Sequence, residues 1–468
     1  MIFTELRFLA FFVAVVATYW ALPANRPRKV WLLAASYAFY AAWDWRFLSL
    51  IWISTLVDYL VGVGLGRTDA PRARRALLIS SLAANLGLLG FFKYFGFFVD
   101  QAMALGELLG FTGHRPSLEI VLPVGISFYT FQTLSYSIDV YRRRIEPTRN
   151  LLDLALFVGF FPQLVAGPIV RAADFLPQLR RLRHWSDVRP SPHLTLFLLG
   201  FVKKACISDN VAATVDAYFA TPQAYDAASA WIAVLLYAIQ IYCDFSGYSD
   251  MAIASAGLLG YDLGPNFRHP YVAASPREFW QRWHISLSTW LRDYLYIPLG
   301  GSRGGELATH RNLMVTMLLG GLWHGAAWSF VLWGGLHGVA LGVHRWWRRW
   351  RGEPTPRTAL GVAAGVALTQ AWVCLGWIFF RAHDMERAWV TVRSWLLFQS
   401  PGTTTIDPWW WVLIVAFALA HGLGARRDWS ALAARAPRWA FAAGYGVAVA
   451  VVLLFVQVDV QPFIYFQF

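Results

Sequence analysis

Histidines inside apolar stretches are the residues of this chain best suited to chemistry, and His324 is the clearest case. It lies in the run Gly-Gly-Leu-Trp-His-Gly at positions 320–325. A neutral imidazole away from water can take a proton from a hydroxyl group, because its ordinary pKa is about 6.5. Gly321 and Gly325 leave space for a ligand or for another backbone, and Trp323 adds an aromatic wall. The alternative is a hydrogen-bonded histidine in a helical core.

A second histidine, His284, ends an aromatic stretch that also holds Arg282. Aromatic and arginine side chains mixed in this way are typical of segments at the membrane surface. His284 therefore either assists chemistry or only anchors an interfacial helix. His337 and His344 are seven residues apart and share one helix face, with which His324 is not aligned. No cysteine or carboxylate completes a ligand set around them, so we expect no metal site.

Two carboxylates, Asp244 and Asp250, lie in an otherwise apolar stretch. Charges inside a membrane segment are costly and are therefore functional candidates, so this pair could position a substrate or orient a histidine. Asp side chains also cap the free N–H groups of a broken helix, and we favour that interpretation. Lys203 and Lys204 are expected to extend toward the cytoplasmic interface.

The elements that hold these residues must be membrane helices, which makes the expected fold class all-α. Of the 468 residues, 57% are apolar and 14% are charged, whereas a soluble domain carries about 25% charged residues. The net charge of +13 would indicate nucleic acid in a soluble protein. Here the arginines cluster in short loops between apolar stretches, as in the cytoplasmic loops of membrane proteins. We therefore expect membrane lipids, and no nucleic acid, around the chain.

A helix that crosses a bilayer needs about 20 mostly apolar residues. The basic loops predict which ends of such helices face the cytoplasm, and they leave both termini outside. The candidate segments are 2–22, 30–43, 47–66, 76–98, 118–138, 151–169, 194–212, 231–260, 312–345, 358–380, 409–424 and 439–457.

Two of these segments, 151–169 and 312–345, have basic residues at both ends and Gly or Pro inside. Both ends should then face the cytoplasm, so we expect each segment to enter the membrane and return on the same side. Such broken backbone must be covered by protein or water, which predicts a polar cavity with His324 at membrane depth. The stretch 266–311 is expected to be a cytoplasmic interfacial segment.

Six blocks of sequence, taken together and in order, resemble the membrane-bound O-acyltransferase (MBOAT) family, and within it the membrane subunit of bacterial alginate O-acetylation. The blocks lie at 122–132, 161–169, 244–250, 280–301, 320–333 and 462–468. The resemblance implies one transmembrane domain over residues 1–468, a ring of about 11 membrane helices with re-entrant segments around a central tunnel. It also implies a catalytic histidine at His324 and an upstream signature position at His284.

The function implied is a membrane acetyltransferase of the bacterial inner membrane that takes an acetyl group from a cytoplasmic donor, acetyl-CoA. The group would pass across the membrane for O-acetylation of an exported, alginate-like polysaccharide. His324 would act as the general base, and His284 would orient it. Substrate-binding positions are expected at Asp244, Trp323, Gly321, Gly325 and Arg282, with the arginine facing the CoA phosphates. The resemblance also implies a separate esterase-like acetyltransferase subunit outside the membrane.

Other functions remain open at this point. Acylation of cellulose or peptidoglycan and D-alanylation of teichoic acid would produce a similar sequence. A transporter or flippase for a polar lipid or polymer would also need many spans and intramembrane polar residues, although it would usually contain inverted repeats. A scaffold of a secretion complex is the third class. It would tolerate the loss of His324.

Overall fold

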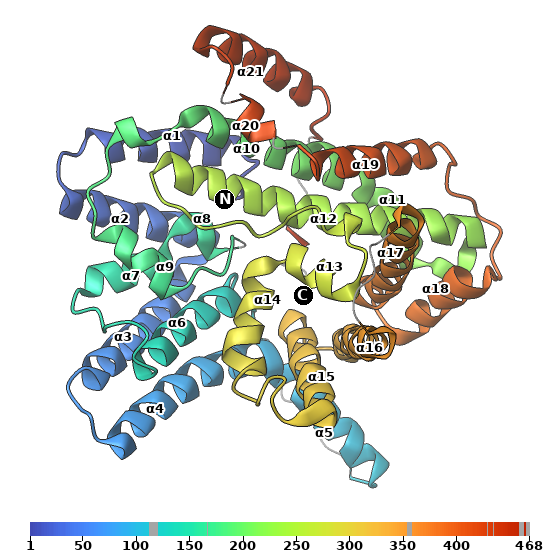
Figure 1. Cartoon of the computed structure of the whole chain (residues 1–468), viewed down its shortest axis with the longest axis horizontal. Helices are drawn as coiled ribbons and strands as arrows, with labels where there is room; N and C mark the ends of the chain where they lie inside the picture. The colour runs from blue at the N-terminus through green and yellow to red at the C-terminus, as the bar shows by residue number, and fades with distance from the viewer. Residues whose placement is uncertain are drawn as a thin grey trace. The chain divides into compact units, whose positions relative to one another are not determined.

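The computed structural model of the chain is built from helices and the loops between them (Figure 1). It describes residues 1–111, 120–165, 167–352, 358–427, 429–433, 435–457 and 463–464. Within these residues the single β-bridge joins Tyr225 and Thr404, so the all-α prediction is confirmed. The chain divides into unit 1, Met1–Arg189 with Ala252–Gly264, and unit 2, Pro190–Met251 with Pro265–Phe468.

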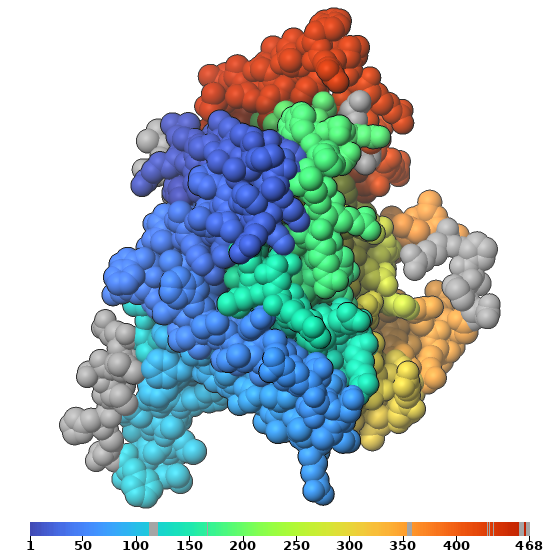
Figure 2. Space-filling view, turned by 90° about the vertical axis from the view of Figure 1, so that its left-hand side faces the viewer, coloured from blue at the N-terminus to red at the C-terminus, as the bar shows by residue number. Residues whose placement is uncertain are grey.

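Unit 1 is formed by the N-terminal helices, among which α3, α4 and α6 pack on one another (Figure 1). Figure 2 shows one face of this unit, where the first helices, in blue, lie beside the segment of α7 to α9, in teal. Its helices are α1 (Leu6–Ala21), α2 (Asn25–Asp44), α3 (Leu48–Leu65), α4 (Pro71–Leu89), α5 (Phe95–Leu108), α6 (Ile126–Tyr141), α7 (Leu151–Gly159), α8 (Phe161–Leu164) and α9 (Ala172–Leu179).

A buried carboxylate lies where α3, α4 and α6 meet. Asp58 on α3 is fully buried. It accepts hydrogen bonds from Ser81 Oγ, from Asn85 Nδ2 at 2.9 Å and from Ser137 Oγ at 2.6 Å. Because a carboxylate away from water is costly unless it is hydrogen-bonded, these donors fix the packing of the three helices.

The segment 151–169 is interrupted, as its Pro and Gly residues predict. Helices α7 and α8 are separated at Phe160, and Pro162 lies in the first turn of α8. Gly125, at the start of α6, has a φ of +78°, and a Cβ there would lie 2.6 Å from the carbonyl oxygen of Leu164. Glycine therefore lets the start of α6 pack against the end of α8. The return of 151–169 to the same membrane side stays a prediction.

Unit 2 contains the remaining helices, including most of α12, whose last residues belong to unit 1. Its helices are α10 (Pro190–Phe201), α11 (Asp209–Ala220), α12 (Ala227–Leu258), α13 (Pro276–Arg282), α14 (Ile285–Leu291), α15 (Gly305–His324), α16 (Trp328–Arg351), α17 (Ala359–Arg381), α18 (Met385–Leu397), α19 (Trp410–Gly424), α20 (Trp429–Ala433) and α21 (Arg438–Leu453).

Four helical stretches of the described chain are long and apolar enough to cross a membrane, namely Asn25–Leu65, Pro71–Leu108, Ala227–Leu258 and Ala359–Arg381. Large apolar side chains are exposed on these and other helices, among them Leu60 at 66% and Leu368 at 74%. Such a surface is unfavourable in water and natural in lipid. The helix count of about 11 and the single domain stay predictions.

Two predicted spans have a different form. The segment 194–212 lies within one continuous helical stretch, in which a π-helical turn at Val202–Ser208 joins α10 to α11, and its crossing of the membrane stays a prediction. The segment 312–345 forms parts of two helices, α15 and α16, as its length predicted. The stretch 266–311 contains short helices whose aromatic residues Phe279, Trp283 and Trp290 are buried. It therefore supplies part of the core of unit 2, and its interfacial position stays a prediction.

Candidate active site

The helical hairpin of α15 and α16 positions His324. The two helices are antiparallel, since Glu306 near the start of α15 pairs with Arg345 near the end of α16. A Cβ at Gly321 would overlap the carbonyl oxygen of Phe330, so only glycine allows the helices to approach this closely. His324 is the last residue of α15 and lies beside the turn of the hairpin.

Aromatic rings surround His324, which is 3% exposed. The centroid of its ring lies 5.0 Å from that of Trp323, 4.9 Å from that of Trp333 and 5.3 Å from that of Phe380. Each of these three rings meets the imidazole edge-on. The neutral form of an imidazole is the form that can accept a proton from a hydroxyl group.

His284 lies between α13 and α14 with a left-handed backbone, at φ +42°. This conformation is uncommon for a residue with a side chain and often marks a functional position. The side chain is fully buried. Burial lowers the pKa of His284 to about 3, so its imidazole is neutral at pH 7.

Asn266 determines which nitrogen of His284 carries the proton. Its Oδ1 accepts hydrogen bonds from the Ser286 backbone N–H at 3.2 Å and from Ser286 Oγ at 2.8 Å, and its Nδ2 donates to Ser249 Oγ at 3.1 Å. These contacts fix the orientation of the amide. His284 Nδ1, 3.2 Å from the same Oδ1, must therefore be the donor. In the neutral ring Nε2 then carries the lone pair.

The structure brings His284 and His324 together, with ring centroids 6.5 Å apart. Trp323 lies beside both rings, 6.1 Å from His284. At this separation the two imidazoles cannot hydrogen-bond directly, since a hydrogen bond needs about 3 Å between the heavy atoms.

The carboxylates Asp244 and Asp250 do not cap a broken helix, because α12 is continuous through both. The capping interpretation was therefore wrong. Asp244 Oδ1 pairs with Lys204 Nζ at 2.6 Å, and Asp250 pairs with Lys203. Lys204 is 2% exposed and also pairs with Asp209 at 2.8 Å, so it does not extend to the interface as predicted. A buried charge is tolerated when it is paired in this way.

Asp244 also holds a C-terminal segment next to the histidines. Its Oδ2 accepts a hydrogen bond from the Ile464 backbone N–H at 2.8 Å. The adjacent Phe463 packs on Phe245, with centroids 5.8 Å apart, and Phe245 meets the His284 ring edge-on at 4.6 Å. Asp244 therefore acts here through the chain end rather than by direct contact with a histidine.

The other predicted substrate-binding residues have structural partners. Gly325 lies against Phe330, whose ring a Cβ at 325 would overlap. Arg282 donates to Glu278 Oε1 at 3.0 Å and to the carbonyl oxygen of Arg268 at 3.0 Å. Substrate contacts by Gly321, Gly325, Trp323 and Arg282 stay predictions.

Sequence reasoning missed a further cluster beside His324. His337 is 2% exposed, and its ring centroid lies 4.8 Å from that of Trp333 and 5.1 Å from that of Trp280. In the described part of the chain, His337 Nε2 and the Nε1 atoms of both tryptophans have no hydrogen-bond partner. The i, i+4 spacing of Trp333 and His337 could have indicated this shared helix face.

Comparison with known proteins identifies the family. A model described as "MBOAT, membrane-bound O-acyltransferase family" matches residues 145–376. The chain is 43% identical over 400 residues to the probable alginate O-acetylase AlgI of Pseudomonas aeruginosa, a match that covers 83% of this chain and 74% of the relative. The chain belongs to the membrane-bound O-acyltransferase family. It is therefore a multi-pass membrane acyltransferase, and the transporter and scaffold alternatives lose their support.

The names of other MBOAT relatives indicate that those proteins act on different polymers. The peptidoglycan O-acetyltransferase of Helicobacter pylori is 39% identical over 388 residues, which cover 77% of this chain and 72% of the relative. The teichoic acid D-alanyltransferase of Bacillus subtilis is 23% identical over 283 residues, covering 57% and 70%. The matched region of the MBOAT model contains both His284 and His324.

The described residues of this MBOAT protein contain no group of three or more His, Cys, Asp or Glu side chains that could hold a metal ion. Its three cysteines, Cys206, Cys243 and Cys374, are free thiols.

Proposed function

We propose that this protein transfers an acetyl group from a cytoplasmic thioester, acetyl-CoA, to a hydroxyl group, for O-acetylation of an exported polysaccharide related to alginate. The observation that carries the proposal is the pair of buried histidines, His284 and His324, 6.5 Å apart in an aromatic setting. The relatives named alginate O-acetylase support the choice of polymer.

The chemistry requires one proton to be moved. As the hydroxyl oxygen bonds to the thioester carbonyl carbon, His324 takes the hydroxyl proton. The carbon–sulfur bond then breaks, the ester forms, and the thiolate takes the proton from His324. His284 supports this step: Asn266 holds its Nδ1–H, and its Nε2 lone pair can accept a hydrogen bond from a water that positions the hydroxyl.

The donor and the acceptor would reach His324 from opposite sides of the bacterial inner membrane. The basic loops support a cytoplasmic side for the thioester, and Arg282 is the proposed contact of the CoA phosphates. On the outer side, a separate esterase-like subunit would receive the acetyl group and pass it to the polysaccharide. The tunnel that joins the two sides belongs to this proposal.

The proposal is tested with His324→Ala and His324→Gln in the full-length protein in its host membrane. We expect O-acetylation of the exported polymer to fall by about 100-fold or more, because a general base contributes at least that much. The protein level in the membrane should not change. His383→Gln is the matched control, since His383 is exposed. Normal acetylation in either His324 variant would refute the proposal.

A further inference from the structure

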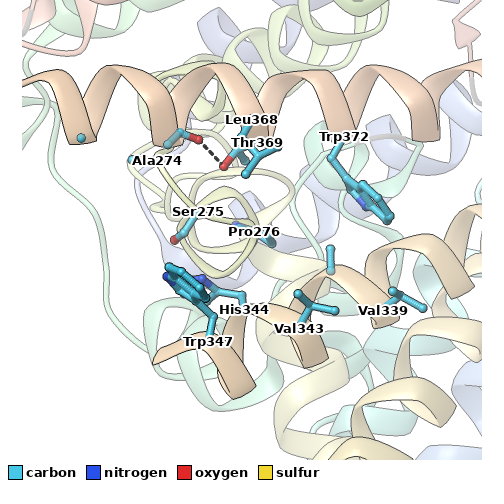
Figure 3. Close-up of a pocket in the computed structure, with 13 residues that line it drawn as sticks. Ala274, Ser275, Pro276, Val339, Val343, His344, Trp347, Leu368, Thr369 and Trp372 are labelled. Atoms are coloured by element: carbon cyan, nitrogen blue, oxygen red, sulfur yellow. Dashed lines mark hydrogen bonds between the residues drawn. The ribbon is translucent and has the colours of Figure 1, made fainter. Parts of the chain in front are cut away.

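A groove of about 570 Å³ lies on unit 2 between the start of α13, the second half of α16 and the first half of α17 (Figure 3). Val343, His344 and Trp347 line it from α16, and Leu368 and Thr369 line it from α17. None of its lining residues belongs to the ring set around His324. The groove is therefore a separate feature from the candidate active site.

Apolar side chains dominate the groove and are open to the surroundings of the protein. Val343 is 58% exposed and Leu368 is 74% exposed. Leu368 lies on α17, which is one of the four stretches able to cross a bilayer, and Val343 lies on α16 beside it. Such a groove suits a hydrocarbon chain.

Three polar groups at the walls make hydrogen bonds within the protein. Thr369 Oγ1 donates to the carbonyl oxygen of Gly365 at 2.7 Å (Figure 3). Trp372 Nε1 donates to the carbonyl oxygen of Leu336 at 3.2 Å, and Ser275 Oγ accepts from a backbone N–H at 3.2 Å. A ligand with amide groups would need hydrogen-bond partners here, whereas a hydrocarbon chain needs none.

Positive charge collects at one end of the groove. Arg348 and Arg351 follow His344 at i+4 and i+7, so they lie on the same face of α16 as this groove residue. The Arg351 guanidinium lies over the ring of Trp347, 5.6 Å from its centroid. The other two arginines of these turns, at 345 and 349, pair instead with a glutamate of α15.

We propose that the groove binds an anionic phospholipid, with one acyl chain between α16 and α17 and the phosphate at Arg348 and Arg351. Trp347 then lies at the level of the headgroups, where tryptophan is enriched. An anionic headgroup is favoured because juxtamembrane arginines attract the negative lipids of the cytoplasmic leaflet. The inference is independent of the acyl transfer proposed above.

The test uses the purified full-length protein in mixed nanodiscs of phosphatidylglycerol and phosphatidylcholine, with retained lipid counted by native mass spectrometry after release. Gly361→Leu places a side chain in the groove, whose wall Gly361 forms. The matched control is Gly446→Leu, because Gly446 is also helical and has open space beside it. We expect Gly361→Leu to lose the retained lipid and Gly446→Leu to keep it. Equal retention in both would refute the groove as the site.

The proposed binding of the lipid phosphate is tested with the double variant Arg348→Gln and Arg351→Gln. We expect the preference for phosphatidylglycerol to fall about fivefold for each arginine removed, while a chain of either lipid is still retained. The control is Arg426→Gln with Arg427→Gln, two arginines outside the groove. A wild-type protein that retains both lipids equally, or whose lipid is displaced by added CoA, would overturn the proposal.

Discussion

Two buried polar clusters differ in how their polar atoms are satisfied. In unit 1 the Asp58 carboxylate accepts hydrogen bonds from three side chains. In unit 2 His337 Nε2 and the Nε1 atoms of Trp280 and Trp333 are buried without a hydrogen-bond partner among the described residues. A hydrogen-bonded polar network stabilises one packing of the helices around it. A buried polar group without a hydrogen bond lowers the stability of the fold, so such a group suggests a functional role. We interpret the first cluster as structural and the second as part of the acyl-transfer site.

The largest effect is expected from Asp58→Ala, which would leave the donors of the unit 1 cluster unsatisfied. We expect the free energy of unfolding to fall by about 3 kcal/mol, since each buried donor without a partner costs about 1 to 3 kcal/mol. Thermal unfolding of the purified protein would measure this. Transfer activity per folded molecule should stay the same, and a selective loss of activity would contradict the structural interpretation. Ser80→Ala, at an exposed serine of α4, is the control.

Asn266→Ala should act on the histidine pair of unit 2. It removes the acceptor of His284 Nδ1, which frees the ring to rotate and to change its tautomer. We expect the transfer rate to fall about 100-fold, because a misplaced catalytic group costs about that much. Initial rates of acetyl transfer by protein of equal amount would measure it. The matched control is Ser249→Ala, which removes the acceptor of Asn266 Nδ2 and leaves the contact with His284 in place. Equal losses in both variants would contradict the positioning role.

The smallest effect on stability is expected from His337→Phe, which keeps a ring and removes the unpaired nitrogen. We expect the free energy of unfolding to rise by about 1 kcal/mol, as a buried polar atom without a partner is removed. The transfer rate should nevertheless fall about tenfold, because His337 packs on Trp333, which contacts the His324 ring, and a displaced catalytic group reacts more slowly. His421→Phe is the paired counterpart, because His421 Nε2 accepts a hydrogen bond from the Tyr271 backbone N–H at 3.2 Å. It should lose stability. The same stability change in both variants would remove the distinction between the two kinds of cluster.

Much of the helical framework could be predicted from hydropathy. The predicted spans 231–260 and 358–380 correspond to α12 and α17, and 409–424 corresponds to α19. Runs of apolar residues bounded by basic loops are a strong local signal. Hydropathy did not predict the π-helical turn at Val202–Ser208, because it reports the composition of a segment and not the hydrogen-bond register of its helix.

The sequence predicts candidate functional residues where a titratable side chain lies in an apolar segment, since such residues are rare there. His324 drew attention as a titratable group among glycines, and the structure surrounds it with rings. Asn266 could not be recognised, because an asparagine in a loop is common and its role comes from contact with His284, 18 residues later. Lys204 was misjudged for the same reason: only the packing of its helix against α12 shows that it pairs with Asp244.

The sequence by itself determined that the chain is a helical membrane protein, that its histidines are unusual and which family it resembles, because composition and short motifs are properties of the linear chain. The tertiary structure decided which of these residues meet. It placed His284 beside His324, paired Lys204 with Asp244 and left the nitrogens of the His337 cluster without a hydrogen-bond partner among the described residues. Distances between residues far apart in the chain depend on how whole helices pack, and that packing is the sum of many weak contacts that no short motif contains.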